Sequence, residues 1–428
     1  MLTAAYMRIR AYVFMACMTF VGVFALTVLL FAVPLRLVKL QWYRNITTCM
    51  LDCVVPGFLL APTLAGLRIN VDAEQWKTQQ ALRADALVSI IMCNHASRVD
   101  WLLALWCGYV QNTVRVSFLT EGPMQFLPIV GWMRKLCEDI FVWRSFKLDK
   151  PRIDANIESF KATKTQRALF LAIEGAIVDQ GEFDKHYIEE CSKFCESLGY
   201  EPFEYVLTPR YKGIHSLAQH AGKEVFSVTT AFVRDGDVLN KKLTDPKRVV
   251  PDLYTILASP IDVTCHFDRF EISSEQELAK RQCMDNYKYR DGMIAHFNEK
   301  GCFPTGLAYN PLPLELPKRL ASLAMQFALY YAGLELFYGK GYYLGYLMVG
   351  LVAVLGTCHS LGELLSGESR ESIPFETIFK SYLYAGRDQK LLKKSKGKAA
   401  ESADAQPAAE KLTETAKMFS LMTKFPAN

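Results

Sequence analysis

The chain has 428 residues, 51% of them hydrophobic, and a mean hydropathy of +0.08. This is too apolar for an ordinary soluble protein and indicates a globular region combined with membrane segments. The formal charge of +5 is too small an excess to indicate nucleic-acid binding, and suits anionic lipid headgroups or a phosphorylated small molecule. The 12 cysteines are scattered, so neither a zinc site nor a disulfide framework is expected.

Two apolar segments open the chain. Ala11–Leu35 carries no charged residue. A bilayer requires about 20 apolar residues in a helix, so we expect a retained membrane anchor here. The stretch Met50–Leu67 is interrupted by Asp52, Pro56 and Pro62 and could be re-entrant, interfacial or a kinked helix. We expect an interfacial segment that does not span, so that residues 1–68 form an N-terminal membrane region.

A histidine and an aspartate follow the first predicted strand of the globular region. Leu87–Met92 is expected to be a short buried strand, and a helix is expected from about Trp101. His95 and Asp100, five positions apart, do not share a helix face and can meet only across a turn. A neutral imidazole is a good general base near pH 7, and a carboxylate on its other nitrogen fixes the tautomer. They are therefore candidate catalytic residues, although this spacing also occurs by chance.

Asn94-His95 followed by Asp100-Trp101 resembles the N-H-x4-D signature of the glycerolipid acyltransferases. The form with D-W is shared by eukaryotic 1-acylglycerol-3-phosphate, lysocardiolipin and lysophosphatidylinositol acyltransferases. The resemblance implies transfer of a fatty acyl group from acyl-CoA to a lysophospholipid hydroxyl, with no metal and no organic cofactor. His95 would take the hydroxyl proton and Asp100 would orient His95. Asn94 and Arg98, inside the signature, are expected to contribute to substrate binding.

Two further segments resemble family blocks. After a predicted strand at Val116–Thr120, Pro128–Trp132 matches the end of the family's K-x-x-L-x-x-x-P-x-x-G-W block, with Glu121 in place of the lysine. Ile140–Arg144 resembles the second block, an extended segment that ends in an arginine. Because a guanidinium fork suits phosphate geometry, Arg144 is a candidate phosphate-binding residue.

The next predicted strand ends in a carboxylate and a glycine. Lys150–Arg167 is expected to be a basic, solvated helix that covers the sheet. The strand from Leu169 then reaches Glu174 and Gly175, which resemble the family's P-E-G-T block without its proline and its polar pair. Glycine permits a tight turn with close backbone approach. Glu174 and Gly175 are therefore expected to position the substrate.

Two cations flank a later turn. Leu207–Gly213 resembles the family's L-x-P-R-x-x-G block and carries Arg210 and Lys212. With Arg144 these residues could form a basic pocket for a lysolipid phosphate. The strand Val225–Phe232 resembles the fourth block and could face an acyl chain.

The rest of the globular region continues the alternation of strands and helices. A strand at Cys265–Phe270 carries His266, which we expect to be structural rather than catalytic, and a helix is expected over Tyr287–Phe303. The alternation from Leu87 to Phe303 indicates an α/β sandwich with a largely parallel or mixed sheet. The acyltransferase domain is therefore predicted over residues 69–310.

Two apolar runs close the chain. Leu320–Tyr338 and Tyr342–Leu361 are joined by Gly339–Gly341 and predict a transmembrane helical hairpin within residues 318–364. Basic residues on both sides of the hairpin predict that the α/β domain and the tail face the cytosol. Residues 387–428 are rich in Lys, Ala and Glu and are expected to be a basic, mostly disordered tail.

The resembling blocks follow the family's order from Ile91 to Phe232. The expected partners are acyl-CoA, a lysophospholipid and a membrane, without nucleic acid, and the family suggests the endoplasmic reticulum. A lysophosphatidate acceptor and a phospholipid-remodelling acceptor both agree with the resemblance. The alternative is a non-catalytic membrane protein whose acyltransferase-like domain binds lipid.

Overall fold

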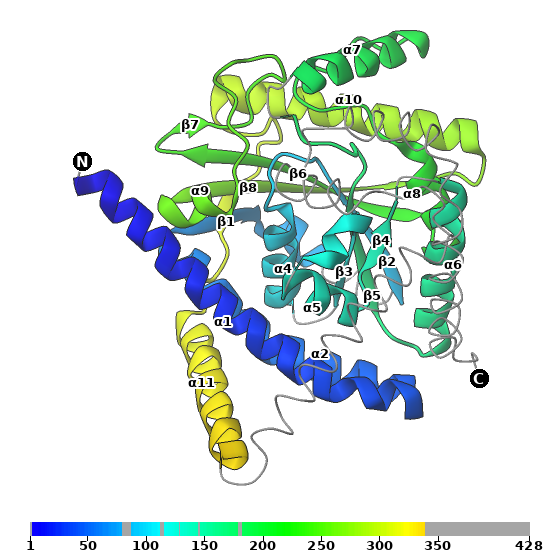
Figure 1. Ribbon diagram of the computed structural model, residues 1–428. Coiled ribbons are helices and arrows are strands. Elements are labelled where there is room, and N and C mark those ends of the chain that lie inside the picture. Colours follow the sequence, from blue (N-terminus) through cyan, green and yellow to red (C-terminus); the bar gives the residue numbers. More distant parts are fainter. Residues whose placement is uncertain are drawn as a thin grey trace, which may run out of the picture. The chain divides into compact units, whose positions relative to one another are not determined.

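The computed structural model describes residues 2–78, 87–111, 115–127, 129–143, 146–178 and 182–338 (Figure 1). The chain divides into two compact units, which are described separately. The first comprises Met1–Val21, Leu51–Leu119 and Lys150–Ala324, and the second Gly22–Met50, Thr120–Asp149 and Met325–Asn428. Arg144, Pro128, the second hairpin helix and the tail lie outside the described residues.

A mixed sheet forms the centre of the first unit, with its strands in the order β3-β5-β2-β6-β8-β1-β9. Strands β3, β5, β2 and β6 run parallel, β8 is antiparallel to β6, and β1 is parallel to β8 and antiparallel to β9. The predicted mixed sheet is therefore confirmed. The strands are β1 Leu67–Asp72, β2 Val88–Cys93, β3 Val116–Glu121, β5 Arg167–Ala172, β6 Glu224–Arg234, β7 Asp237–Val238 (paired with β6), β8 Ile261–Glu271 and β9 Tyr309–Pro311.

Helices cover both faces of this sheet (Figure 1). Successive residues of a strand point to opposite faces. Accordingly, Phe226 and Phe232 of β6 share a core with Trp106 of α4, whereas Ala231 packs with Met293 of α10. The helices of this part are α4 Asp100–Gln111, α6 Phe146–Ala162, α7 Glu182–Ser197, α8 Tyr211–Ala221, α9 Leu253–Ala258 and α10 Gln276–Lys300.

The predicted solvated helix Lys150–Arg167 is wrong at its end. Helix α6 stops at Ala162, and Arg167 opens β5 with its side chain fully buried. The Arg167 guanidinium lies 4.8 Å from the centre of the Phe160 ring and donates to Ser117 Oγ at 3.3 Å. An aromatic face and a hydroxyl thus hold a cation inside the protein.

Two N-terminal helices are long and apolar enough to cross a membrane, which indicates membrane association. They are α1 Leu2–Val38 and α2 Leu40–Ala65. In the first unit, Arg10 of α1 donates to the carbonyl groups of Leu64 and Ala65 at the end of α2. These carbonyls have no partner inside the helix, so the contact caps α2.

The segment Met50–Leu67, expected as an interrupted interfacial stretch, lies mostly within α2, which continues through Pro56 and Pro62. A proline removes one helical hydrogen bond. Next to Pro56, Ser322 of α11 (Leu316–Tyr338) accepts from the Gly57 amide at 3.0 Å and donates to the Cys53 carbonyl. Next to Pro62, Arg319 of α11 donates to the Leu59 carbonyl at 3.1 Å. Polar side chains of α11 thus satisfy the backbone of α2 beside both prolines.

The second unit contains part of α1 and α2, the 3-10 turn Gly122–Phe126, helix α5 Val130–Leu136 and strand β4 Ile140–Val142. The Arg44 guanidinium of α2 forms a two-armed ion pair with the Glu138 carboxylate at 2.8 and 2.9 Å. Because buried charges are costly unless paired, this contact fixes the segment after α5 against α2.

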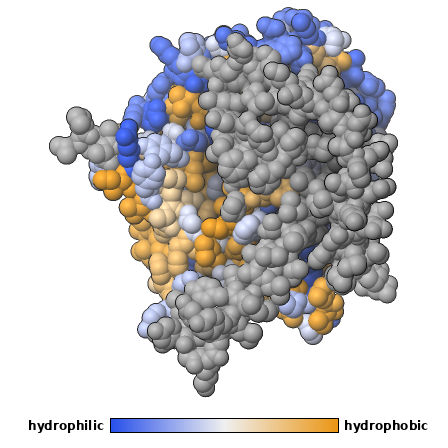
Figure 2. Space-filling view, in the orientation of Figure 1, coloured by the Kyte–Doolittle hydropathy of each residue, from blue (hydrophilic) through white to orange (hydrophobic). Residues whose placement is uncertain are grey.

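Part of α11 presents apolar side chains to the outside. Figure 2 shows hydrophobic surface where this helix lies, at the lower left of the view. A soluble surface rarely exposes so many large apolar groups together. The predicted transmembrane hairpin extends beyond the described residues and stays a prediction. The exposed residues are Leu320, Met325, Phe327, Leu329, Tyr330 and Tyr331.

Candidate active site

The predicted strand, turn and helix around His95 are confirmed. Strand β2 ends at Cys93 and α4 begins at Asp100. His95 Nδ1 lies 2.9 Å from Asp100 Oδ2, and the His95 side chain is 28% exposed while Asp100 is buried. A carboxylate can only accept, so Nδ1 carries the proton and donates it. The other ring nitrogen, Nε2, therefore keeps its lone pair for a substrate proton.

Asp100 is fixed by its own turn. Ser97 Oγ donates to Asp100 Oδ1 at 2.6 Å, and the Ser97 amide donates to Oδ2 at 3.4 Å. As the first residue of α4, Asp100 also lies at the end of the helix dipole that stabilises negative charge. A cavity of about 30 Å³ adjoins Asp100 between α4 and the sheet, lined largely by apolar side chains that include Leu103, Phe226 and Val228. The hydrogen bonds from Ser97 fix the position of the Asp100 carboxyl group against His95.

Asn94 joins two strands. The Thr230 amide donates to Asn94 Oδ1 at 2.8 Å, and Asn94 Nδ2 donates to the Thr230 carbonyl at 3.1 Å. The side chain is buried, and both ends of its amide are used within the protein. The structure therefore supports a positioning role for Asn94 at the end of β2, rather than the predicted substrate contact.

Glu174 supports the backbone of the catalytic turn. Strands β2 and β5 are in parallel register with Cys93 opposite Ala172, so His95 and Glu174 each lie two residues beyond their strand. Glu174 Oε1 accepts from the His95 amide at 2.8 Å and Oε2 accepts from the Leu207 amide at 3.2 Å. Burial raises the pKa of the Glu174 carboxyl, and the His95 amide opposes that rise. Glu174 thus holds His95 in place from inside the protein.

Gly175, Tyr187 and Arg210 form the wall beside this carboxylate. Tyr187 Oη donates to the Glu174 carbonyl at 3.1 Å and accepts from Arg210 Nη2 at 2.9 Å and Nε at 3.2 Å. Gly175 has φ +72°, and a Cβ there would lie 2.4 Å from Arg210 Nε. Glycine is therefore required for Arg210 to lie across the turn. Tyr187 belongs to no motif, and the sequence analysis missed it.

Arg98 and Lys212, two further predicted site residues, have exposed side chains. The Arg98 amide donates to the Pro251 carbonyl at 2.9 Å, and the Arg98 side chain is exposed. Lys212 is exposed in the first turn of α8. The structure thus gathers His95, Asp100, Glu174 and Arg210 around the carboxyl ends of β2 and β5, where loops commonly carry function.

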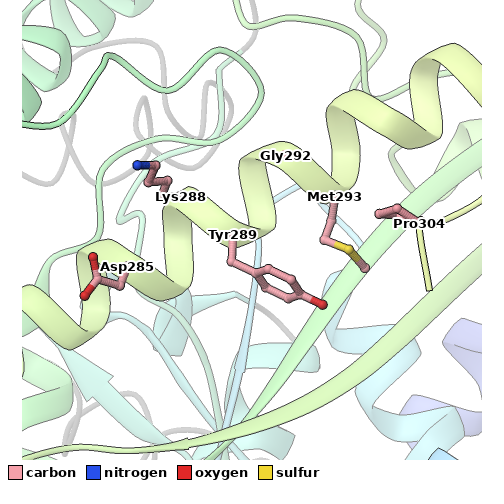
Figure 3. A pocket seen from close by; sticks show the side chains of 6 residues that line it. All are labelled: Asp285, Lys288, Tyr289, Gly292, Met293 and Pro304. Carbon is pink, nitrogen blue, oxygen red and sulfur yellow. The ribbon is translucent and has the colours of Figure 1, made fainter.

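A second hollow, of about 410 Å³, lies on α10 (Figure 3). Tyr289 and Met293 line it with Pro304, while Asp285 and Lys288 lie at one side. The Tyr289 hydroxyl is 3.4 Å from Nε2 of the buried His266. His266 Nδ1 lies 2.9 Å from the Tyr309 hydroxyl. Both ring nitrogens contact side chains, which supports the predicted structural role of His266.

Comparison with known proteins agrees with this geometry. Residues 77–231 match the family model described as Acyltransferase. Lysocardiolipin acyltransferase 1 of Mus musculus is 28% identical over 42% of this chain and 45% of its own length. Probable 1-acyl-sn-glycerol-3-phosphate acyltransferase 5 of Arabidopsis thaliana is 25% identical over 50% of this chain and 55% of its own length. No solved structure matches the chain significantly.

A third relative, 1-acyl-sn-glycerol-3-phosphate acyltransferase epsilon of Mus musculus, is 24% identical over 49% of this chain and 57% of its own length. The chain therefore spans about half the length of these curated relatives. The matched region contains β2, α4, β5 and most of β6, the elements that hold the site. The family model over residues 77–231 and these relatives together support the resemblance of this region to the glycerolipid acyltransferase family.

Proposed function

We propose that this protein is an acyl-CoA-dependent acyltransferase that esterifies a free hydroxyl of a 1-acyl-lysophospholipid. The observation that carries the proposal is the His95–Asp100 pair, with Nδ1 bound to a buried carboxylate and Nε2 available on a partly exposed ring. This is the arrangement of a general base that acts on a substrate hydroxyl.

In the proposed reaction, His95 Nε2 takes the proton of the acceptor hydroxyl as its oxygen attacks the thioester carbonyl of acyl-CoA. The tetrahedral intermediate collapses, the carbon–sulfur bond breaks, and the proton on Nε2 passes to the departing CoA sulfur. Asp100 stabilises the imidazolium that forms in between. Protein groups supply every proton transfer, so acyl-CoA enters as a co-substrate and no organic cofactor or metal is invoked.

Substrate binding is assigned to the surroundings of this pair. Arg210, held by Tyr187, would bind a phosphate of the substrate, with Lys212 as a further cation. Arg144 lies outside the described residues and stays a candidate from the sequence alone. We propose that the acyl chain lies near β6, as the resemblance of Val225–Phe232 to the fourth family block implies. The relatives are named for lysocardiolipin and 1-acyl-sn-glycerol-3-phosphate, so we propose phosphatidate synthesis or phospholipid remodelling.

Helices α1 and α2 would hold the reaction at a membrane surface, where both lipid substrates concentrate. We place the protein in the endoplasmic reticulum, with the catalytic domain and the tail facing the cytosol. This orientation follows from the basic residues that flank the C-terminal apolar runs.

The test is acyl transfer by membranes that contain this chain, with labelled oleoyl-CoA and a panel of lysophospholipids that includes lysophosphatidate and monolysocardiolipin. Labelled diacyl product from one acceptor, lost in His95→Ala, would support both the reaction and the role of His95. A folded protein that gives no product with any acceptor would overturn the proposal in favour of a non-catalytic lipid-binding protein.

A further inference from the structure

The loop between β7 and α9, residues 239–252, borders the candidate active site at two places. Near its start, the buried Leu243 packs in one cluster with Tyr187 and Leu207, and its amide donates to the Glu204 carbonyl at 2.7 Å. Near its end, the Pro251 carbonyl accepts from the Arg98 amide in the catalytic turn at 2.9 Å. The loop therefore runs from the wall that carries Arg210 to the turn that carries His95.

The middle of this loop is held by its own hydrogen bonds. The Lys247 amide donates to Asp245 Oδ1 at 2.7 Å, and the Arg248 amide donates to the Asp245 carbonyl at 3.0 Å. The Val249 amide donates to the Leu239 carbonyl at 3.2 Å. The backbone is fixed on both sides of Arg248. This residue therefore has a defined position in the loop, between the wall that carries Arg210 and the turn that carries His95.

The Arg248 side chain is partly buried and only partly satisfied. Nη1 donates to the Lys241 carbonyl, whereas Nε is buried and has no hydrogen-bond partner among the residues that the structure describes. Burial lowers the pKa of Arg248, and the Glu174 carboxylate opposes that shift. Glu174 is the group that holds the His95 amide, so Arg248 is near enough to the site for this carboxylate to act on its charge.

A buried donor without a partner costs free energy unless a ligand supplies the acceptor. A guanidinium presents several donors in one plane and matches the oxygens of a phosphate. Within the described residues, neither Arg210 nor Arg248 forms an ion pair with an acidic side chain.

We infer that Arg248 is a phosphate-binding residue of the active site, which acts beside Arg210 on a phosphorylated substrate. The inference rests on the proposed acyl transfer, in which the acceptor and CoA both carry phosphate. The sequence analysis missed Arg248 because it lies outside every block that resembles the family.

The experiment compares Arg248→Gln with Lys247→Gln. Lys247 is the exposed neighbour on the same loop, so its variant makes the same charge change away from the site. Each substrate is varied at saturation of the other. Removing a charged hydrogen bond to phosphate is expected to raise one KM about tenfold or more. Lys247→Gln should keep both KM values, and Arg248→Lys, which retains the charge without the fork, should lie between.

The KM that changes identifies the phosphate. A rise for the lysophospholipid assigns Arg248 to the acceptor, and a rise for oleoyl-CoA assigns it to the donor. Equal KM values for Arg248→Gln and Lys247→Gln, or a fall in kcat alone, would overturn the inference. Thermal unfolding of each variant shows whether it folds. If Arg248→Gln does not fold, the KM values of Arg248→Lys are compared with those of Lys247→Gln instead.

The inference can also be separated from the proposed function. If the wild-type protein transfers no acyl group, binding of labelled oleoyl-CoA and of lysophosphatidate in detergent micelles is measured directly. Weaker binding of either compound by Arg248→Gln than by Lys247→Gln would support the phosphate site without the reaction. Equal binding by the two variants would overturn it.

Discussion

Two histidines in the first unit show how different surroundings give the same side chain different uses. His95 follows a strand, bonds one ring nitrogen to the Asp100 carboxylate and keeps 28% of its side chain exposed. His266 lies within β8, is 4% exposed, and contacts the Tyr309 and Tyr289 hydroxyls through its two nitrogens. Of these two histidines, His95 is the one that combines a carboxylate partner with a nitrogen that a substrate can reach.

The contrast lies in what each histidine can do with a proton. An imidazolium at His95 would face a carboxylate, which stabilises it. Among the residues that the structure describes, no carboxylate lies at hydrogen-bond distance from His266, and burial lowers the pKa of His266 below its ordinary value of 6.5. His266 therefore remains neutral and structural, whereas His95 can accept a proton during a reaction.

The same substitution at both positions should give the largest effect. His95→Gln removes the proposed base and is expected to lower kcat about 10²- to 10⁴-fold, the usual contribution of a general base. His266→Gln should retain most of the wild-type kcat. Acyl transfer by the two purified variants gives the comparison, and a similar loss in both would remove the distinction between the histidines.

The partner of His95 should be nearly as important. Asp100→Asn removes the charge that stabilises the imidazolium and is expected to lower kcat about a hundredfold, with little change in KM. Asp72→Asn is the control, because Asp72 is a buried carboxylate near His266 that accepts from the backbone amides of Glu74 and Gln75. Steady-state kinetics check the prediction. An equal fall of kcat in both variants would contradict it, because the loss would then come from a destabilised fold and not from the role of Asp100.

A smaller effect is expected where the wall beside His95 is displaced. Gly175→Ala would place a Cβ 2.4 Å from Arg210 Nε, so KM for the phosphate-bearing substrate should rise about tenfold. Gly236→Ala also has a positive φ, of +81°, but meets no atom within 4 Å. Both variants should lose about 1 kcal/mol of stability. A KM that is unchanged in Gly175→Ala would argue against a phosphate at Arg210.

The smallest effect concerns the pH dependence of folding. Because the folded-state pKa of His266 lies below the value of about 6.5 expected when unfolded, the unfolded chain binds more protons. Stability from a neutral His266 is therefore present above about pH 6.5 and lost as pH falls toward the folded-state pKa. His266→Gln should lose less stability than wild type between pH 7.5 and 5.5, as measured by thermal unfolding. If the unfolding temperatures of the two proteins fall in parallel with pH, His266 is not a histidine that the fold keeps neutral.

The amino-acid sequence by itself determined the local frame of the site. The buried run before Cys93, the turn and the helix from Asp100 are decided by neighbouring residues, so pattern alone predicted how His95 and Asp100 meet. The predicted strand before Glu174 and the apolar helix at the N-terminus have the same origin. Strand β1 escaped prediction because its alternation lies at the end of a longer apolar run.

Only the tertiary structure decided what surrounds that frame. Glu174 meets the His95 amide, 79 residues away, because β5 lies beside β2 in a particular register. Tyr187 and the loop of Leu243 reach the wall beside the site through helix and loop packing, and Arg167 is buried because Phe160 and Ser117 lie beside it. Such contacts depend on which distant segments pack together, and local sequence patterns do not carry that information.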